Sequence, residues 1–277
     1  MTNPDRPAGR GMEPRPSEVK VAADAHGVPV LQPEKARDPD FHDRLRAIAP
    51  DCCVVVAYGK ILPASLLAIP PLGFVNVHFS LLPAYRGAAP VQRALMDGVT
   101  ETGVSIMVLT EGMDEGPVLA TASIPVGEND TAGEVGDRLA EVGAGLLVET
   151  LEAYAAGSIK PVEQDHESAT YAPKITNEET RIDWTQPTER IRNLVRALNP
   201  VSGAWTTLGE ARLKVYEVAP VAGADLEPGE LQAGDGLIVG TGDGAVALLE
   251  VQPAGKRRMS GDEFARGLRD VSAMRLS

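Results

Sequence analysis

The stretch Asp51–Tyr58 reads DCCVVVAY, and the stretch Gly73–Phe79 reads GFVNVHF. The first is apolar after its opening aspartate and β-branched in its middle, which is typical of a buried strand in a parallel sheet. In the second, polar Asn76 and His78 alternate with apolar residues, so we predict a strand with one polar face. A sheet is therefore expected at the centre of the N-terminal half.

Two further strands are predicted at Thr102–Thr110 and Ala120–Pro125. Helical segments accompany them, notably at Ala89–Asp97 and Ala132–Ala156. Because strands alternate with helices, we predict an α/β fold with a mostly parallel, Rossmann-like sheet. Residues 1–18 hold four prolines and two glycines, so we predict a loop there.

A polar connector without periodicity occupies residues 158–183. After it come an amphipathic helical pattern at Pro187–Leu198 and then short strand-like segments separated by glycine-containing turns. Such segments are typical of a small antiparallel barrel. We therefore predict a first domain at residues 1–157, a linker at 158–183 and a β domain at 184–277.

Composition excludes several classes of protein. The 26 lysines and arginines against 39 aspartates and glutamates give a net charge of −13, which argues against a protein that simply coats nucleic acid. The longest apolar run, Cys52–Ala57, is far shorter than the roughly 20 residues that span a bilayer, and the N-terminus lacks the apolar stretch of a secretory signal. The two adjacent cysteines cannot build a disulfide framework. We expect a monomer in the cytoplasm without membrane contact.

Neither a metal site nor a dinucleotide site is expected. No spacing of histidines, cysteines and acidic residues fits a metal centre. The glycine-rich stretch Gly234–Gly244 lies among short β segments and opens no helix, so it does not meet the requirements of a dinucleotide-binding loop. His26, His42 and His166 lie in polar segments, and we expect them at the surface.

The candidate site lies at the end of the second strand. Asn76 and His78 share one face of it because side chains alternate with a period of two. Ligands of parallel sheets bind beyond the carboxyl ends of the strands, where this pair would lie. Asp114 follows the next predicted strand, within Glu111–Pro117 (EGMDEGP). Taken alone, such an asparagine and histidine are more often a structural pair with satisfied hydrogen bonds than catalytic residues.

A family resemblance changes that balance. The pattern Asn-x-His-x-Ser-Leu-Leu-Pro at Asn76–Pro83, with Asp114 after the next strand, resembles the signature of the N10-formyltetrahydrofolate-dependent formyltransferases. The similarity continues at Val55–Leu62 (VVAYGKIL) and Arg86–Gln92 (RGAAPVQ), and it covers essentially the whole chain. It implies the formyltransferase fold followed by an OB-type barrel, with 10-formyltetrahydrofolate as co-substrate and no metal.

The resemblance also implies a role for each site residue. Asn76 and His78 would stabilise the oxyanion that forms when an amine attacks the formyl carbon, and His78 would carry the proton of the amine. Asp114 would orient His78 or a water molecule. The tetrahydrofolate would contact the loop that follows the strand, formed by Ser80, Leu81, Leu82 and Pro83.

Two basic segments point to the second substrate. Asp5–Gly11 (DRPAGRG) and Val251–Ser260 (VQPAGKRRMS) resemble the family members that formylate methionyl initiator tRNA for translation initiation. A run of three basic residues is, by itself, usually only solvated. With the resemblance, we expect tRNA contacts from the basic residues of both segments: Arg6, Arg10, Lys256, Arg257 and Arg258.

Three alternatives stay open. A relative that acts on an amino-sugar nucleotide shares the catalytic trio, although it would not require the two basic segments. Enzymes that formylate glycinamide ribonucleotide, or that hydrolyse formyltetrahydrofolate, resemble this chain in its N-terminal half only. The third alternative is a catalytically impaired folate- or tRNA-binding remnant. This alternative arises from a difference at the start of the sequence. In the family, a strand–helix–strand unit precedes the segment DRPAGRG, whereas in this sequence Met1 lies almost directly before it. From that difference we expect poor folding or impaired activity of the chain as written.

Overall fold

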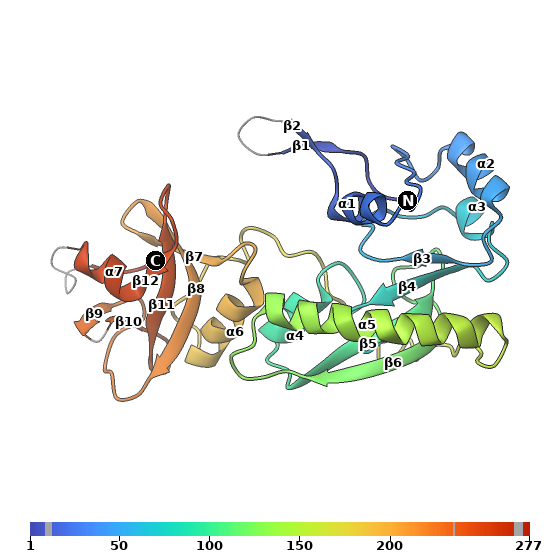
Figure 1. The fold of residues 1–277 in the computed structure, drawn as a ribbon. Helices are drawn as coiled ribbons and strands as arrows, with labels where there is room; N and C mark the ends of the chain where they lie inside the picture. Colours follow the sequence, from blue (N-terminus) through green and yellow to red (C-terminus); the bar gives the residue numbers. More distant parts are fainter. Residues whose placement is uncertain (9–12, 235, 269–273) are drawn as a thin grey trace. The chain divides into compact units, whose positions relative to one another are not determined.

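The structure is a computed structural model that describes residues 1–8, 13–234, 236–268 and 274–277 (Figure 1). The chain forms two compact units, and neither is a continuous stretch of sequence. The first comprises Met1–His78, Ser105–Thr121 and Gly145–Glu167, and the second comprises Phe79–Val104, Ala122–Ala144 and Ser168–Ser277. Within the described residues, no helix combines the length and the apolar character that crossing a membrane requires.

The first residues form a hairpin where we predicted a loop. Strands β1 (Arg6–Ala8) and β2 (Glu13–Arg15) pair antiparallel, and Pro7 lies opposite Pro14. Prolines are tolerated there because both strands of a two-stranded ribbon are edge strands and need no ladder on their outer side. The proline-rich composition therefore excluded a central strand but not this short ribbon.

Two helices follow, and each begins at a side-chain cap. In α1 (Glu18–Ala25), the hydroxyl of Ser17 accepts a hydrogen bond from the backbone N–H of Lys20. In α2 (Pro39–Ile48), Asp38 caps the backbone N–H of Asp40, and a proline occupies the first position, where its missing N–H costs nothing. The buried face of α2 joins the core of the first unit, which contains Ala36, Phe41, Leu45, Leu62, Leu66 and Phe74.

A four-stranded sheet confirms the α/β prediction. Its strands are β3 (Cys53–Val55), β4 (Phe74–His78), β5 (Glu101–Val108) and β6 (Val118–Pro125), in the spatial order β3-β4-β5-β6. The short helix α3 (Ala64–Leu67) lies between β3 and β4 in the chain. The sheet is mixed, because β4 runs parallel to β3 and antiparallel to β5.

Strand β3 is shorter and more exposed than its composition predicted. Only Cys53–Val55 is strand, and the side chains of Val54 and Val56 are 43% and 52% exposed. The strand is exposed because it lies at the edge of the described sheet. An apolar run in a sequence does not show whether both faces of a strand are covered. The half-buried Cys53 has its thiol pKa raised to about 11, mainly by desolvation, so this thiol stays protonated near neutral pH.

Three helices confirm their predicted positions to within two residues. They are α4 (Pro90–Met96), α5 (Ala132–Ala155) and α6 (Thr188–Leu198). Helix α6 places Ile191, Val195 and Leu198 in the core of the second unit. Helix α6 also carries two arginines, Arg192 and Arg196, whose side chains bind the segment before α5.

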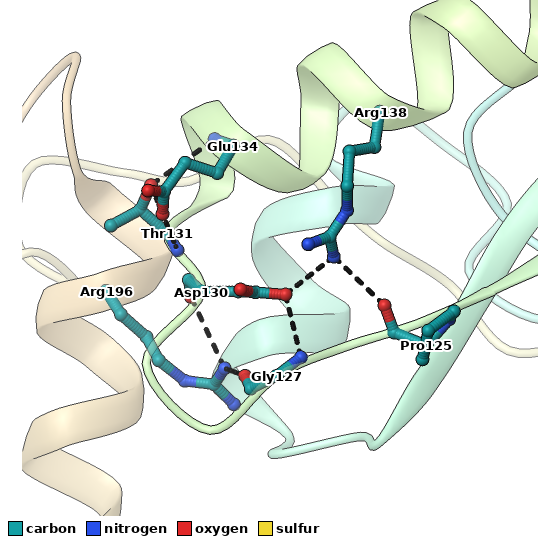
Figure 2. Close-up of polar contacts among 7 residues, drawn as sticks. All are labelled: Pro125, Gly127, Asp130, Thr131, Glu134, Arg138 and Arg196. Carbon is teal, nitrogen blue, oxygen red and sulfur yellow. Dashed lines mark hydrogen bonds and ion pairs between the residues drawn. The ribbon is translucent and has the colours of Figure 1, made fainter.

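Figure 2 shows this polar cluster at the start of α5. Asp130 accepts hydrogen bonds from Arg138 at 2.6 Å and from the backbone N–H of Gly127 at 2.7 Å. Arg196 donates to the carbonyl oxygens of Gly127 and Asp130. The hydrogen bond from Arg138 is the main reason why the pKa of Asp130 lies below its ordinary value of 3.8. Thr131 and Glu134 complete a reciprocal cap for α5.

The C-terminal strands confirm a small antiparallel β domain. They are β7 (Ala204–Leu208), β8 (Ala211–Val221), β9 (Leu231–Gly234), β10 (Gly236–Gly240), β11 (Ala245–Pro253) and β12 (Met259–Ser260). The spatial order is β7-β8-β11-β10-β9, with β12 on β11, and every described pair is antiparallel. Helix α7 (Gly261–Arg266) begins at Ser260, whose hydroxyl accepts from the N–H of Glu263.

Both tryptophans belong to this part of the chain. Trp184 is buried and donates its indole N–H to the hydroxyl of Thr206 at 2.9 Å. Trp205 is half-buried on β7, and the guanidinium groups of Arg181 and Arg212 lie over its ring at 5.6 and 4.0 Å from the ring centre. One tryptophan therefore has an apolar environment and the other a charged one.

Candidate active site

Strand β4 carries the first two candidate residues on one face. Asn76 is half-buried, and His78, the last residue of the strand, is 5% exposed. In the antiparallel register with β5, Ser105 lies directly opposite His78 and is fully buried. Because directly opposed side chains share a face of the sheet, His78 lies in a polar strip of an otherwise apolar strand pair.

Asp114 approaches His78 from the loop between β5 and β6. One carboxylate oxygen of Asp114 lies 3.7 Å from Nδ1 of His78, and the two side chains are 17% and 6% exposed. This separation is an ion-pair distance and is longer than a direct hydrogen bond. Catalytic contacts are often long in a protein without substrate and shorten when substrate is bound. The structure thus brings His78 and Asp114 together, with Asn76 on the same face of β4.

The backbone of the Asp114 loop has an unusual conformation. Asp114 has φ = 52°, in the left-handed region that residues other than glycine enter only occasionally. The loop is closed at its base by a hydrogen bond of 2.9 Å from the N–H of Val108 to the carbonyl of Pro117. Gly116 packs against Val108 so closely that a Cβ atom would overlap its carbonyl oxygen.

Gln164 is a residue of this region that the sequence analysis missed. Its side chain is 7% exposed, and Nε2 donates to the carbonyl oxygens of Asp114 at 2.9 Å and of Gly116 at 2.6 Å. It lies 50 positions beyond Asp114, in a segment predicted to be a linker. No motif or periodicity marks it, so only the folded chain shows this contact.

The predicted folate loop begins two residues after His78. Ser80 is fully buried, and its hydroxyl donates to the carbonyl of Ala84 at 2.5 Å, while Leu81, Leu82 and Pro83 are half-buried. The carbonyl of Pro83 accepts from the N–H of Thr170. The predicted loop is therefore a well-packed turn of the second unit.

Arg86, which follows that turn, is buried to an unusual degree. Its side chain is 2% exposed, and its backbone pairs with Thr170 and Ala172 through hydrogen bonds of 2.9 and 2.7 Å. Gly87 has φ = 125° and lies against the carbonyl oxygen of Ala172, so a side chain would not fit. These contacts make the predicted linker, at 170–172, a structural support of the turn.

The basic residues predicted to contact tRNA fall into two places. Arg6 lies in β1 of the first unit, and Arg10 lies outside the described residues. Lys256 and Arg257 are exposed in the β domain, and Arg257 forms an ion pair with Glu263 at 2.7 Å. Arg258 is largely engaged within its own domain.

Three contacts hold Arg258. Its guanidinium lies 3.4 Å from the ring centre of Tyr216 and donates to the carbonyl of Pro200 at 2.6 Å. Glu250 lies 3.5 Å away as a weaker ion-pair partner. We therefore assign Arg258 mainly to holding the basic loop, whereas Lys256 presents its charge to solvent.

Among the described residues, no three histidine, cysteine or acidic side chains are close enough to hold a metal ion together.

The surface prediction for the other three histidines is wrong at one position. His26 and His166 are exposed, but His42 is only 6% exposed. The surface prediction for His42 was wrong because its ring nitrogen Nε2 lies 2.8 Å from the carbonyl of Ala36, which satisfies it inside the core.

Comparison with known families assigns both halves of the chain. Residues 1–151 match the family model described as "Formyl transferase", and residues 174–269 match "Formyl transferase, C-terminal domain". Together these matches include the catalytic candidates and the exposed basic loop.

Curated relatives are similar over nearly their entire length. A methionyl-tRNA formyltransferase of Streptomyces coelicolor is 50% identical over 278 residues, which cover 100% of this chain and 90% of the relative. One from Thiobacillus denitrificans is 47% identical, covering 96% of this chain and 87% of the relative.

Solved structures share the fold at much lower identity. HypX from Aquifex aeolicus in complex with tetrahydrofolic acid aligns with a TM-score of 0.65 at 22% identity, over 84% of this chain and 41% of that one. The sugar 3N-formyltransferase WlaRD aligns with a TM-score of 0.62 at 17% identity, over 87% and 82%.

Proposed function

The chain belongs to the formyltransferase family, among the methionyl-tRNA formyltransferases, and from this we propose that it transfers the formyl group of 10-formyltetrahydrofolate to the amino group of methionyl initiator tRNA. The observation that carries the proposal is the full-length similarity to methionyl-tRNA formyltransferases, and the juxtaposed His78 and Asp114 supply a candidate catalytic pair. Formylated methionyl-tRNA is the product used in translation initiation.

We propose that Asn76 and His78 act on the charge that develops during transfer. The methionyl amine attacks the formyl carbon, a C–N bond forms, and the formyl oxygen becomes an oxyanion. The Asn76 amide and the His78 ring are donors that can stabilise this oxygen. When the bond between the formyl carbon and N10 breaks, the proton lost by the amine passes to N10, and His78 can carry it because a histidine ring can both accept and donate a proton.

Asp114 supports His78 in this proposal. A carboxylate at this distance from Nδ1 can hold the orientation of the ring. The folate co-substrate would contact the turn Ser80–Pro83, whose internal hydrogen bond from Ser80 to Ala84 fixes its shape before binding. Neither step requires a metal ion.

We assign the domains on the same basis. Residues 1–157 would perform the chemistry, 158–183 would connect the domains, and the OB-type domain at 184–277 would help to hold the tRNA. The tRNA contacts would come from the basic residues of Asp5–Gly11 and of the exposed loop: Arg6, Arg10, Lys256 and Arg257, with a smaller direct part for Arg258. The enzyme would act as a monomer in the cytoplasm.

The test is formyl transfer by this chain with 10-formyltetrahydrofolate and methionyl initiator tRNA. We expect formylmethionyl-tRNA from the unchanged chain and a loss of at least about 100-fold in rate for His78→Ala. Asn199→Leu is a matched control because Asn199 donates to the carbonyl of Tyr216, within the second unit and outside the proposed machinery.

A second acceptor separates the nearest alternative. Sugar N-formyltransferases are similar to this chain in fold alone, so an amino-sugar nucleotide should receive no formyl group in the same assay. Transfer to the sugar but not to the tRNA would overturn the proposal. Folate binding without transfer to either acceptor would favour the impaired remnant.

A further inference from the structure

Gln164 bridges two carbonyl groups of the loop that carries Asp114. Both hydrogen bonds come from its Nε2 atom, which lies 2.9 Å from the oxygen of Asp114 and 2.6 Å from that of Gly116. The side chain is 93% buried, so these bonds form where water competes little. A single side chain from a distant segment thus fixes two peptide groups of the loop, the one after Asp114 and the one after Gly116.

The segment of Gln164 has an anchor of its own. Val162 and Val118 exchange two backbone hydrogen bonds of 2.8 Å, which join the segment to the start of β6. Loss of the Gln164 amide would therefore leave its backbone attached to the sheet. What would lose its support is the Asp114 loop.

The loop needs that support because of its conformation. At φ = 52°, Asp114 is in a region that its own Cβ disfavours, and such residues persist only where their surroundings hold them. The carboxylate of Asp114 lies 3.7 Å from Nδ1 of His78. If the peptide at Asp114 rotated to a more ordinary conformation, its side chain would be redirected away from this position.

We propose that Gln164 is a positioning residue for formyl transfer. By binding the carbonyls of Asp114 and Gly116, it holds Asp114 in the left-handed conformation that directs the carboxylate toward His78. This inference rests on the proposed function, because it takes Asp114 and His78 to be catalytic. Gln164 itself acts through Asp114.

A double-mutant cycle tests this assignment. The variants are Gln164→Leu, which removes the donor at similar volume, Asp114→Ala, and the combination of both. We expect Gln164→Leu to lower kcat about tenfold, with KM for methionyl-tRNA and for folate within about twofold of the unchanged chain. In the Asp114→Ala background the same substitution should change the rate by less than about twofold. Single-turnover reactions with enzyme in excess keep the slow variants measurable.

Two further variants control for folding. Gln164→Met keeps the side-chain length but supplies no hydrogen-bond donor, so it should lower kcat as Gln164→Leu does, and it decides the question if the leucine variant unfolds. Asn199→Leu also removes an amide donor to a backbone carbonyl, in this case half-buried and far from this loop in sequence, and should leave kcat within about twofold.

The outcomes separate the two proposals. A tenfold loss on top of Asp114→Ala, or an unchanged kcat in both Gln164 variants, overturns the role of Gln164 while leaving formyl transfer intact. A rise in KM with unchanged kcat also overturns it. Absence of formyl transfer by the unchanged chain removes the proposed function, and this inference with it.

Discussion

Gly116 shows how one residue determines the position of the loop that carries Asp114. Its missing side chain lets the loop lie against the carbonyl of Val108. We expect Gly116→Ala to push the loop outward, lowering the free energy of unfolding by roughly 1–3 kcal/mol and formyl transfer more than tenfold. Urea denaturation followed by circular dichroism and the formylation assay measure the two effects.

Gly145→Ala is the matched substitution. Gly145 lies within α5, and no described neighbouring atom comes within 4 Å of the position that its Cβ would take. Alanine should therefore stabilise this helix by about 0.5–1 kcal/mol and leave catalysis unchanged. Equal destabilisation by both substitutions would contradict the packing argument at Gly116.

The sequence could predict some site residues but not others. Strand periodicity places Asn76 and His78 on one face, and the family resemblance adds Asp114. The position of Asp114 after the next strand was not enough, because β5 runs antiparallel to β4. Gln164 could not be predicted, because its role depends on two backbone carbonyls that lie about 50 positions away, and carbonyls leave no trace in a sequence. His42 was misassigned for a related reason, since its buried partner is also a backbone carbonyl.

At the scale of elements, the cluster before α5 makes a pH-dependent contribution to stability. The hydrogen bond from Arg138 lowers the pKa of Asp130 below 3.8, so the folded state holds this carboxylate ionised at pH values where the unfolded chain begins to protonate it. The stabilisation is therefore present above about pH 4 and is lost as the pH falls through the folded-state pKa.

Asp130→Asn tests this sign. At pH 7 the variant should lose about 1 kcal/mol of unfolding free energy, because a charged acceptor of Arg138 is replaced by a neutral one. The difference from the unchanged chain should shrink on acidification below pH 4 (about the ordinary pKa). Urea unfolding at pH 7, 5 and 3 measures this difference. Asp137→Asn is the control, because Asp137 is an exposed carboxylate on α5. A difference that grows toward pH 3 would contradict the assignment.

Elements were predicted best where their pattern is long. Helices α4, α5 and α6 and the strands of the β domain follow from periodicity and turn residues. The hairpin of β1 and β2 was missed because proline-rich ribbons have no pattern of their own. Strand β3 was expected to be buried because composition does not distinguish an edge strand from a central one.

For the whole molecule, the charge of −13 limits how the enzyme can bind a polyanion. In the proposed function, tRNA binding depends on a few local cations, of which Lys256 is exposed. We expect Lys256→Gln to weaken tRNA binding and to reduce the slope of log affinity against log salt concentration by about 0.9. Binding measured between about 50 and 200 mM salt gives this slope.

Arg258→Gln should behave differently although it neutralises the same loop. It removes the stacking on Tyr216 and the hydrogen bond to Pro200, so we expect a loss of about 1 kcal/mol in the stability of the β domain. Its effect on the salt slope should be smaller than that of Lys256→Gln. Identical slopes for the two variants would show that Arg258 binds phosphate directly.

The placement of the two tryptophans gives the molecule a built-in optical reporter. Both lie within residues 184–205, so the intrinsic fluorescence of the chain reports on the β domain and its surroundings, while far-ultraviolet dichroism averages over every helix and strand. If the two compact units melt independently, the two signals will trace different denaturation curves; if they melt as one, the curves will superimpose. Quenching by iodide should act on Trp205, beside two cations, before it reaches the buried Trp184.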